Sequence, residues 1–156
     1  MGLQTRLDID TRPFVLEELP SCKRLDNAVL LQDAGRSGDI EPRTLMARIA
    51  ATGKWVTYTD ETATDGTAIP AGIYDPEGNL GAIAEADIQA GDVEDLPILI
   101  FGALFDRDLL VIENSKTLGT IIAATTVNAQ TVEEALKKIS LIPQNTDSGS
   151  AVENPA

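Results

Sequence analysis

Two short apolar runs joined by glycine turns constrain the fold of this chain more than any other feature. Residues 45–49 and 55–59 alternate β-branched or aromatic residues with others, and Gly53-Lys54 lies between them. This spacing predicts a β-hairpin. An acidic loop, 60–66, follows, and then the unit Pro70-Ala-Gly-Ile-Tyr74. We therefore expect a small β-rich domain that binds other molecules rather than transforms them.

Further strands are predicted downstream. Residues 81–88 alternate apolar and polar positions, which favours a strand with one buried face. Residues 96–105 are apolar almost throughout, as in a strand buried on both faces. Residues 109–112 and 120–126 would supply additional strands.

A short helix is predicted near the C-terminus, over residues 131–139. Thr131 and Glu134 have the spacing of a capping box. Four apolar residues fall on one stripe that should face the core, namely Val132, Ala135, Leu136 and Ile139. Beyond Pro143 the composition turns to Asn, Ser, Gly and Asp, and we expect residues 144–156 to form a flexible tail.

The N-terminal residues, 1–39, are predicted to form an extended arm. Their apolar residues gather in two patches, Phe14-Val15-Leu16 and Ala28–Leu31, among charges and prolines. Pro13 disfavours a helix and favours an extended strand at the first patch. Two interpretations stay open: both patches pack on the domain's own core, or one pairs with the sheet edge of a partner.

Composition limits the possible functions. The 156 residues fit one domain, 43% are hydrophobic, and only 4% are aromatic, so small aliphatic side chains must fill the core. The formal net charge is −13. Such a chain repels phosphate, because nucleic-acid binders need clustered cations. We therefore expect no nucleic-acid partner.

Catalytic and metal-binding residue types are scarce. The chain has no histidine, which removes the usual catalytic triads, and its one cysteine, Cys22, excludes an internal disulfide. Loop 60–66 carries three carboxylates, but its glycine stands at the seventh position, not the sixth that an EF-hand needs. We expect no metal, no cofactor and no enzymatic activity. We also expect no membrane partner and a cytosolic protein when made, because no run approaches ~20 apolar residues and residues 1–10 lack a signal core.

The order of these parts resembles the head decoration proteins of tailed bacteriophages, the lambda-type capsid-stabilising family. The resemblance covers residues 40–143: a proline before Arg43-Thr-Leu45, the glycine turn, the aromatic strand, the acidic Asp-Gly loop and Pro-Ala-Gly-Ile. The apolar strand that contains Gly102, and the final short helix before Leu141-Ile-Pro143, are also similar.

What the resemblance implies is a β-rich α+β fold, a small β-barrel or tulip-like domain at 40–143 with a short C-terminal helix. It also implies a homotrimer that binds the major capsid protein on the outer surface of the expanded head, so that the protein is located in the virion and, during assembly, in the host cytoplasm. The acidity then has two interpretations, solubility alone or exclusion from the genome. The alternative function is a non-phage enzyme, or a carrier domain modified at Lys54.

The candidate capsid contact lies in the predicted arm. Arg12, Pro13, Phe14, Val15 and Leu16 are proposed to form it, because this stretch is partly apolar, extended and expected to be free of the core. This hypothesis rests on the residues and not on the family resemblance, which begins only at Ile40.

Overall fold

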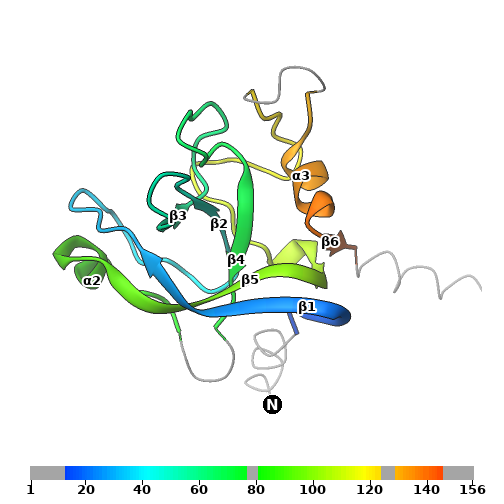
Figure 1. Cartoon of the computed structure of the whole chain (residues 1–156), viewed down its shortest axis with the longest axis horizontal. Helices are drawn as coiled ribbons and strands as arrows, with labels where there is room; N and C mark the ends of the chain where they lie inside the picture. Colours follow the sequence, from blue (N-terminus) through cyan, green and yellow to red (C-terminus); the bar gives the residue numbers. More distant parts are fainter. Residues whose placement is uncertain (1–12, 77–80, 124–128, 146–156) are drawn as a thin grey trace, which may run out of the picture.

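Strands dominate the fold. The computed structural model describes residues 13–76, 81–123 and 129–145, and this part of the chain has an α+β fold rich in strands, as predicted (Figure 1). The elements in chain order are β1 (Val15–Leu30), β2 (Thr44–Arg48), β3 (Trp55–Thr57), β4 (Pro70–Tyr74), α2 (Glu85–Ala90), β5 (Val93–Asp106), the 3-10 helix η1 (Arg107–Leu109), α3 (Val132–Lys138) and β6 (Leu141–Gln144).

The strands of the described residues form one six-stranded sheet in the order β1-β3-β2-β4-β5-β6. β1 also pairs with β5, so the pairings lead from β1 through β3, β2, β4 and β5 back to β1. The contacts of β1 with β3 and of β5 with β6 are parallel, and the others are antiparallel. Phe105 of β5 pairs with both Val15 and Pro143, which brings the two described ends of the chain together.

The predicted hairpin is confirmed as β2 and β3. Arg48 pairs with Trp55 and Met46 with Thr57 across it. Gly53 in the turn has φ +74°, a conformation that glycine adopts at little cost. β4 pairs with the other side of β2, so the Pro-Ala-Gly-Ile unit forms a strand within the sheet.

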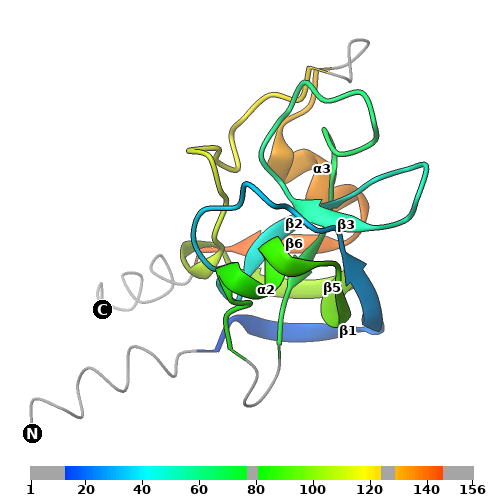
Figure 2. The same ribbon diagram turned by 90° about the vertical axis from the view of Figure 1, so that its left-hand side faces the viewer.

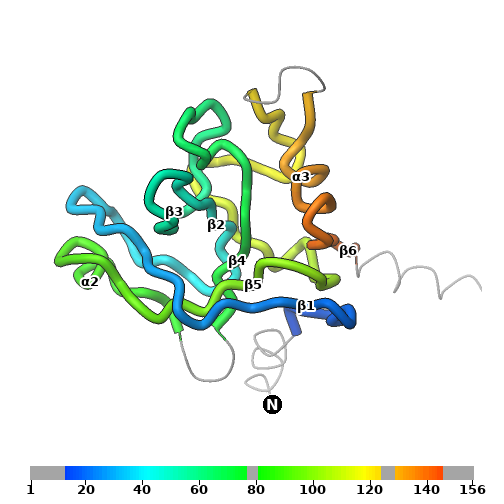
Figure 3. Tube along the Cα trace, viewed as in Figure 1, coloured from blue at the N-terminus to red at the C-terminus, as the bar shows by residue number. Residues whose placement is uncertain are grey.

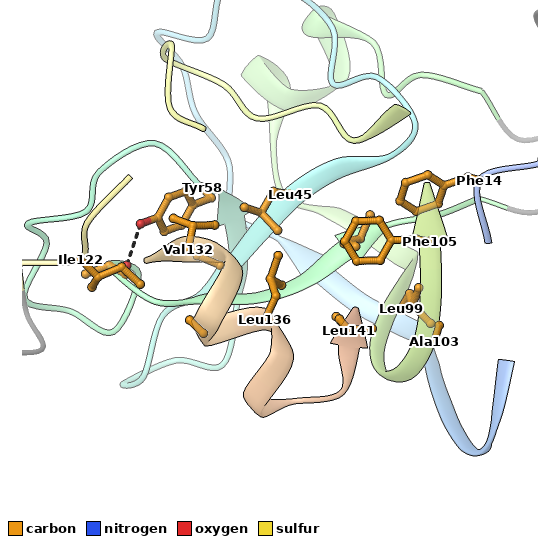
Figure 4. Packing of buried hydrophobic residues seen from close by; sticks show 14 residues of the cluster. Phe14, Leu45, Tyr58, Leu99, Ala103, Phe105, Ile122, Val132, Leu136 and Leu141 are labelled. Atoms are coloured by element: carbon orange, nitrogen blue, oxygen red, sulfur yellow. Dashed lines mark hydrogen bonds between the residues drawn. The ribbon is translucent and has the colours of Figure 1, made fainter. Parts of the chain in front are cut away.

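The central strands are buried on both faces, which explains their continuous apolar sequences. Ile98 packs in one core and its neighbour Leu99 in the other, because successive strand residues point to opposite faces. One core lies between the sheet and α3 (Figure 4). The other lies beside α2 and contains Trp55, which is 3% exposed. The prediction that residues 96–105 form a doubly buried strand is therefore confirmed within β5.

Residues 15–30, which the sequence places in an N-terminal arm, form β1 and pair with β5 along most of its length (Figure 3). Phe14, Ala28 and Leu30 are buried in the chain's own cores. Of the two interpretations left open for the apolar patches, packing on the chain's own core is the one found. The expectation that residues 12–16 are free of the core is wrong at Phe14. The apolar residues of β1 are far apart in the sequence, and pairing with β5 brings them into the two cores. Residues 1–12 lie outside the described residues.

The predicted C-terminal helix is confirmed as α3. Thr131 accepts a hydrogen bond from the Glu134 amide, and the Glu134 side chain accepts one from the Thr131 amide, which completes the capping box. Val132, Ala135 and Leu136 are buried. Among the described residues, no helix has the length and apolar character to cross a membrane.

Three predicted strands are wrong in the described residues. Residues 85–90 form α2 instead of continuing a strand, because the Asp39 side chain, distant in sequence, caps the Glu85 amide at 2.9 Å. Residues 109–112 and 120–123 contribute only isolated bridges, at Val111 and Ile121. Residues 124–126, also predicted as strand, lie outside the described residues. The predicted flexible tail begins inside β6 at Gln144, and residues 146–156 lie outside the described residues as well.

Candidate protein-binding surface

The five predicted contact residues differ in their accessibility. Arg12 lies outside the described residues. Pro13 is exposed, Val15 is half-buried and Leu16 is 40% exposed. Phe14 is only 4% exposed and belongs to the core next to α3. The extended conformation predicted here is found in β1, but Phe14 packs inside its own chain and cannot also contact a partner.

Phe14 fixes the start of β1. Its ring centroid lies 5.2 Å from that of Phe105, and the Arg43 guanidinium carbon lies 5.9 Å from the same ring, within cation–π range. The Phe14 carbonyl accepts a hydrogen bond from the Asp106 amide at 2.8 Å. Leu16 is therefore presented from an anchored strand.

Arg43 is held in a strained conformation beside this anchor. Its φ of 74° lies in the left-handed region, which costs a non-glycine residue about 1–2 kcal/mol. Two backbone hydrogen bonds maintain it: its amide donates to the Tyr74 carbonyl at 2.6 Å, and its carbonyl accepts from the Val111 amide at 2.9 Å. Val111 is itself 37% exposed. The surface next to Phe14 thus includes Arg43 and Val111, which sequence patterns did not indicate.

Among the described residues, no strand pairs with the outer side of β1 at Val15–Glu18. Within the described residues, the strand partners of residues 15–28 all lie on β5, and β1 reaches β3 only at Leu30. β5 is paired on its other side with β6. β1 consequently borders the molecule in both ribbon views (Figures 1 and 2). An unpaired edge offers backbone donors and acceptors to another strand.

A bulge limits the regular part of this edge. Glu18 pairs with Ala103 and Lys23 with Phe101, so residues 19–22 stand opposite Gly102 alone. Gly102 has φ +79°, and a Cβ there would lie 2.9 Å from backbone atoms of Cys22. Pro20 inside the bulge lacks an N–H. A second register shift falls between Val15 and Glu17, so Leu16 itself lies at a bulge. Before residues 19–22, only Glu17 and Glu18 pair with consecutive residues of β5.

Carboxylates flank the exposed leucine on this edge. Glu17 and Glu18 are exposed, and Glu18 forms an ion pair with Arg24 at 2.9 Å. Arg24 also contacts Asp75 at 2.5 Å. The start of β1 therefore combines an apolar side chain with negative charge.

A second surface lies at the opposite end of the molecule from β1 (Figures 1 and 2). A hollow of about 510 Å³ is lined here by small or apolar residues of loop 62–69, together with Ala123. The carboxylates of this loop are occupied within the chain. Asp60 accepts hydrogen bonds from Thr62, and Asp65 from Thr67, and these bonds lower the pKa of both aspartates.

A partly buried ion pair connects the loop before β2 to Glu113. Arg36 donates to both carboxylate oxygens of Glu113, at 2.7 and 2.5 Å. Burial raises the pKa of Glu113, but the hydrogen bonds from Arg36 and Thr57 and the Arg36 charge outweigh it, so the net shift is downward. Lys54, the carrier candidate, lies at the hairpin turn and pairs with Asp92 at 2.6 Å.

Comparison of the chain with family models, with curated proteins and with solved structures finds no match. The geometry described above is therefore the basis for a functional proposal. The sequence did not indicate two features of it: the edge of β1 that no described strand covers, and the hollow whose described lining residues are uncharged. Both features are formed by segments that are distant in the sequence. Ile69 and Ile121, which are exposed in the structure, lie in apolar stretches of the sequence, and these stretches were the only indication of the hollow.

Proposed function

We propose that this protein decorates the outer face of a bacteriophage head and has no catalytic role. The resemblance of residues 40–143 to head decoration proteins supplies the class of function. The edge of β1 at Val15–Glu18 carries the proposal, because no described strand pairs with its outer side and a bulge in this anchored strand exposes Leu16. A strand of the major capsid protein adds to this edge and satisfies its backbone groups.

The chemistry of the edge defines the capsid segment that fits it. Leu16 needs an apolar neighbour, and the exposed Glu17 and Glu18 favour basic side chains. The partner is thus an extended segment that combines apolar and basic residues. Phe14 takes no part in this contact and positions the strand from within the core.

The finer fold and the assembly belong to the same proposal. The series of pairings that returns to β1 supports a small barrel of the tulip-like kind. Three copies form a homotrimer at the local threefold positions of the expanded head. Three weak contacts then act together, because the second and third form at high effective concentration. Preference for the expanded head follows if the capsid strand is accessible only there, since a ligand shifts an equilibrium by its differential affinity.

The net charge of −13 supports this location. An acidic protein made beside viral DNA in the host cytoplasm is repelled by the phosphate backbone. It therefore remains available for the outer surface of the head.

Co-sedimentation with expanded heads tests the proposal. Leu16→Asp adds a negative charge and removes the apolar contact at a 40% exposed position, so we expect folded protein that no longer sediments with heads. Ala51→Asp places the same group at an exposed position in the β2–β3 turn and should bind as the wild type does. Wild-type protein that stays in the supernatant at saturating concentration would contradict the function, and a Leu16→Asp variant that binds normally would remove β1 from the contact.

A further inference from the structure

The two carboxylates on the edge of β1 lie on different faces of the strand. Glu17 pairs with Leu104 of β5 and Glu18 with Ala103, so this two-residue stretch follows regular strand pairing. Successive residues of such a stretch point to opposite faces of the sheet. Ala103 belongs to the core next to α3. Glu18 therefore lies on the face that carries this core, and Glu17 lies on the other face.

Glu18 already has a cation beside it. The Arg24 guanidinium lies 2.9 Å from the Glu18 carboxylate and 2.5 Å from that of Asp75, which follows β4. Arg24 pairs with Leu99, another residue of the core next to α3, so it shares a face with Glu18. The ion pair spans the bulge at 19–22. The charge of Glu18 is therefore compensated before any partner binds.

Glu17 has no such cation among the described residues. It is exposed, and no hydrogen bond or ion pair within the described ranges engages its carboxylate. Its direct neighbour on β5, Leu104, is apolar. Side chains of directly paired strand residues have Cβ atoms about 4.5–5.5 Å apart, so a cation opposite Glu17 on an added strand is attracted to it. Glu18 makes the same contact only by giving up Arg24.

We propose that Glu17 is the specificity-determining residue of this edge and selects a capsid strand with a lysine or arginine opposite it. Glu18 stays paired with Arg24 and does not discriminate between capsid segments. This assignment rests on the proposed function, from which the added strand is taken.

Co-sedimentation of two matched variants with expanded heads, at several salt concentrations, tests the assignment. Glu17→Gln and Glu18→Gln remove the same charge from adjacent exposed positions, so both make the net charge of −13 less negative by one. Long-range electrostatic attraction therefore changes equally. Glu17→Gln should weaken binding up to about fivefold per contact at low salt, and more in a trimer, and should flatten its salt dependence. Glu18→Gln should bind as the wild type does, since Arg24 keeps Asp75 as a partner.

The outcomes separate this assignment from the proposed function. Equal losses of binding in the two variants, or a larger loss in Glu18→Gln, overturn the assignment. A Glu17→Gln variant with the affinity and salt dependence of the wild type also overturns it, and capsid decoration through β1 then stands if Leu16→Asp still fails to sediment. Wild-type protein that stays in the supernatant contradicts the function and overturns the assignment with it. Urea unfolding of both variants confirms that they are folded, so that lost binding reports the contact.

Discussion

Replacement of Phe14 by alanine should destabilise the protein although the residue lies at the start of the first described strand. Phe14 is 4% exposed and packs 5.2 Å from the Phe105 ring, centroid to centroid. Buried Phe→Ala substitutions cost about 3–5 kcal/mol. We expect about 3 kcal/mol here, because Phe14 directly precedes β1 and its neighbours can relax into part of the space. That is a large share of the ~5–15 kcal/mol that stabilises a typical domain.

Urea unfolding followed by the fluorescence of Trp55 measures this loss, because the only tryptophan is 3% exposed in the native state. In a thermal scan the same loss lowers the midpoint by about 6–12 °C for a chain of this size. Leu16→Ala, at the 40% exposed neighbouring position, should change stability by less than about 1 kcal/mol. A Phe14→Ala variant with the wild-type urea midpoint would refute the reasoning, because it would show that the start of β1 is detached from the core.

Substitutions at three other sites have separate expected outcomes. The pKa of Glu113 in the folded state lies below its ordinary 4.5, so the stabilisation by its pair with Arg36 is complete above pH 4.5 and is lost as pH falls through the lower folded value. Glu113→Gln should flatten this acid limb of the urea midpoint, and an unchanged limb would contradict the assignment. Gly72→Ala puts a Cβ 2.9 Å from a β5 carbonyl oxygen and should lower the free energy of unfolding in urea by about 1–3 kcal/mol. Gly91→Ala, where the added Cβ meets open space, should leave that free energy nearly unchanged. Equal effects of the two substitutions would contradict the packing around Gly72. Burial raises the pKa of Tyr58 to about 12, and the nearby carboxylates of Glu61 and Asp60 add to this shift. Tyr58→Phe should therefore remove a tyrosine titration step, followed by ultraviolet absorbance, near that pH. Loss of a step near pH 10 would contradict the burial.

Local sequence signals predicted the elements whose causes are local. The hairpin turn at Gly53 and the capping box of Thr131 and Glu134 act within a few residues, and both are present. The doubly buried strand was predictable because its neighbours bury both faces and leave a continuous apolar run. These elements surround the core next to α3.

Elements that depend on distant contacts were not predictable. Residues 81–88 alternate like a strand, but the Asp39 carboxylate, 46 residues away, caps helix α2. β1 was interpreted as an arm because its pattern is polar, and only β5 shows which of its residues are buried. Of the candidate site, the sequence indicated the extended segment and Leu16. It did not indicate that Phe14 belongs to the core, because an apolar residue has the same sequence signal in a core and in a contact.

A cryo-electron microscopy map of expanded heads saturated with this protein tests the central claim most directly. We predict trimeric density at the local threefold positions, with β1 residues 15–18 against an extended strand of the capsid protein. Bare threefold positions, or a protein bound through the end that carries Ile69 and Ile121, would contradict it.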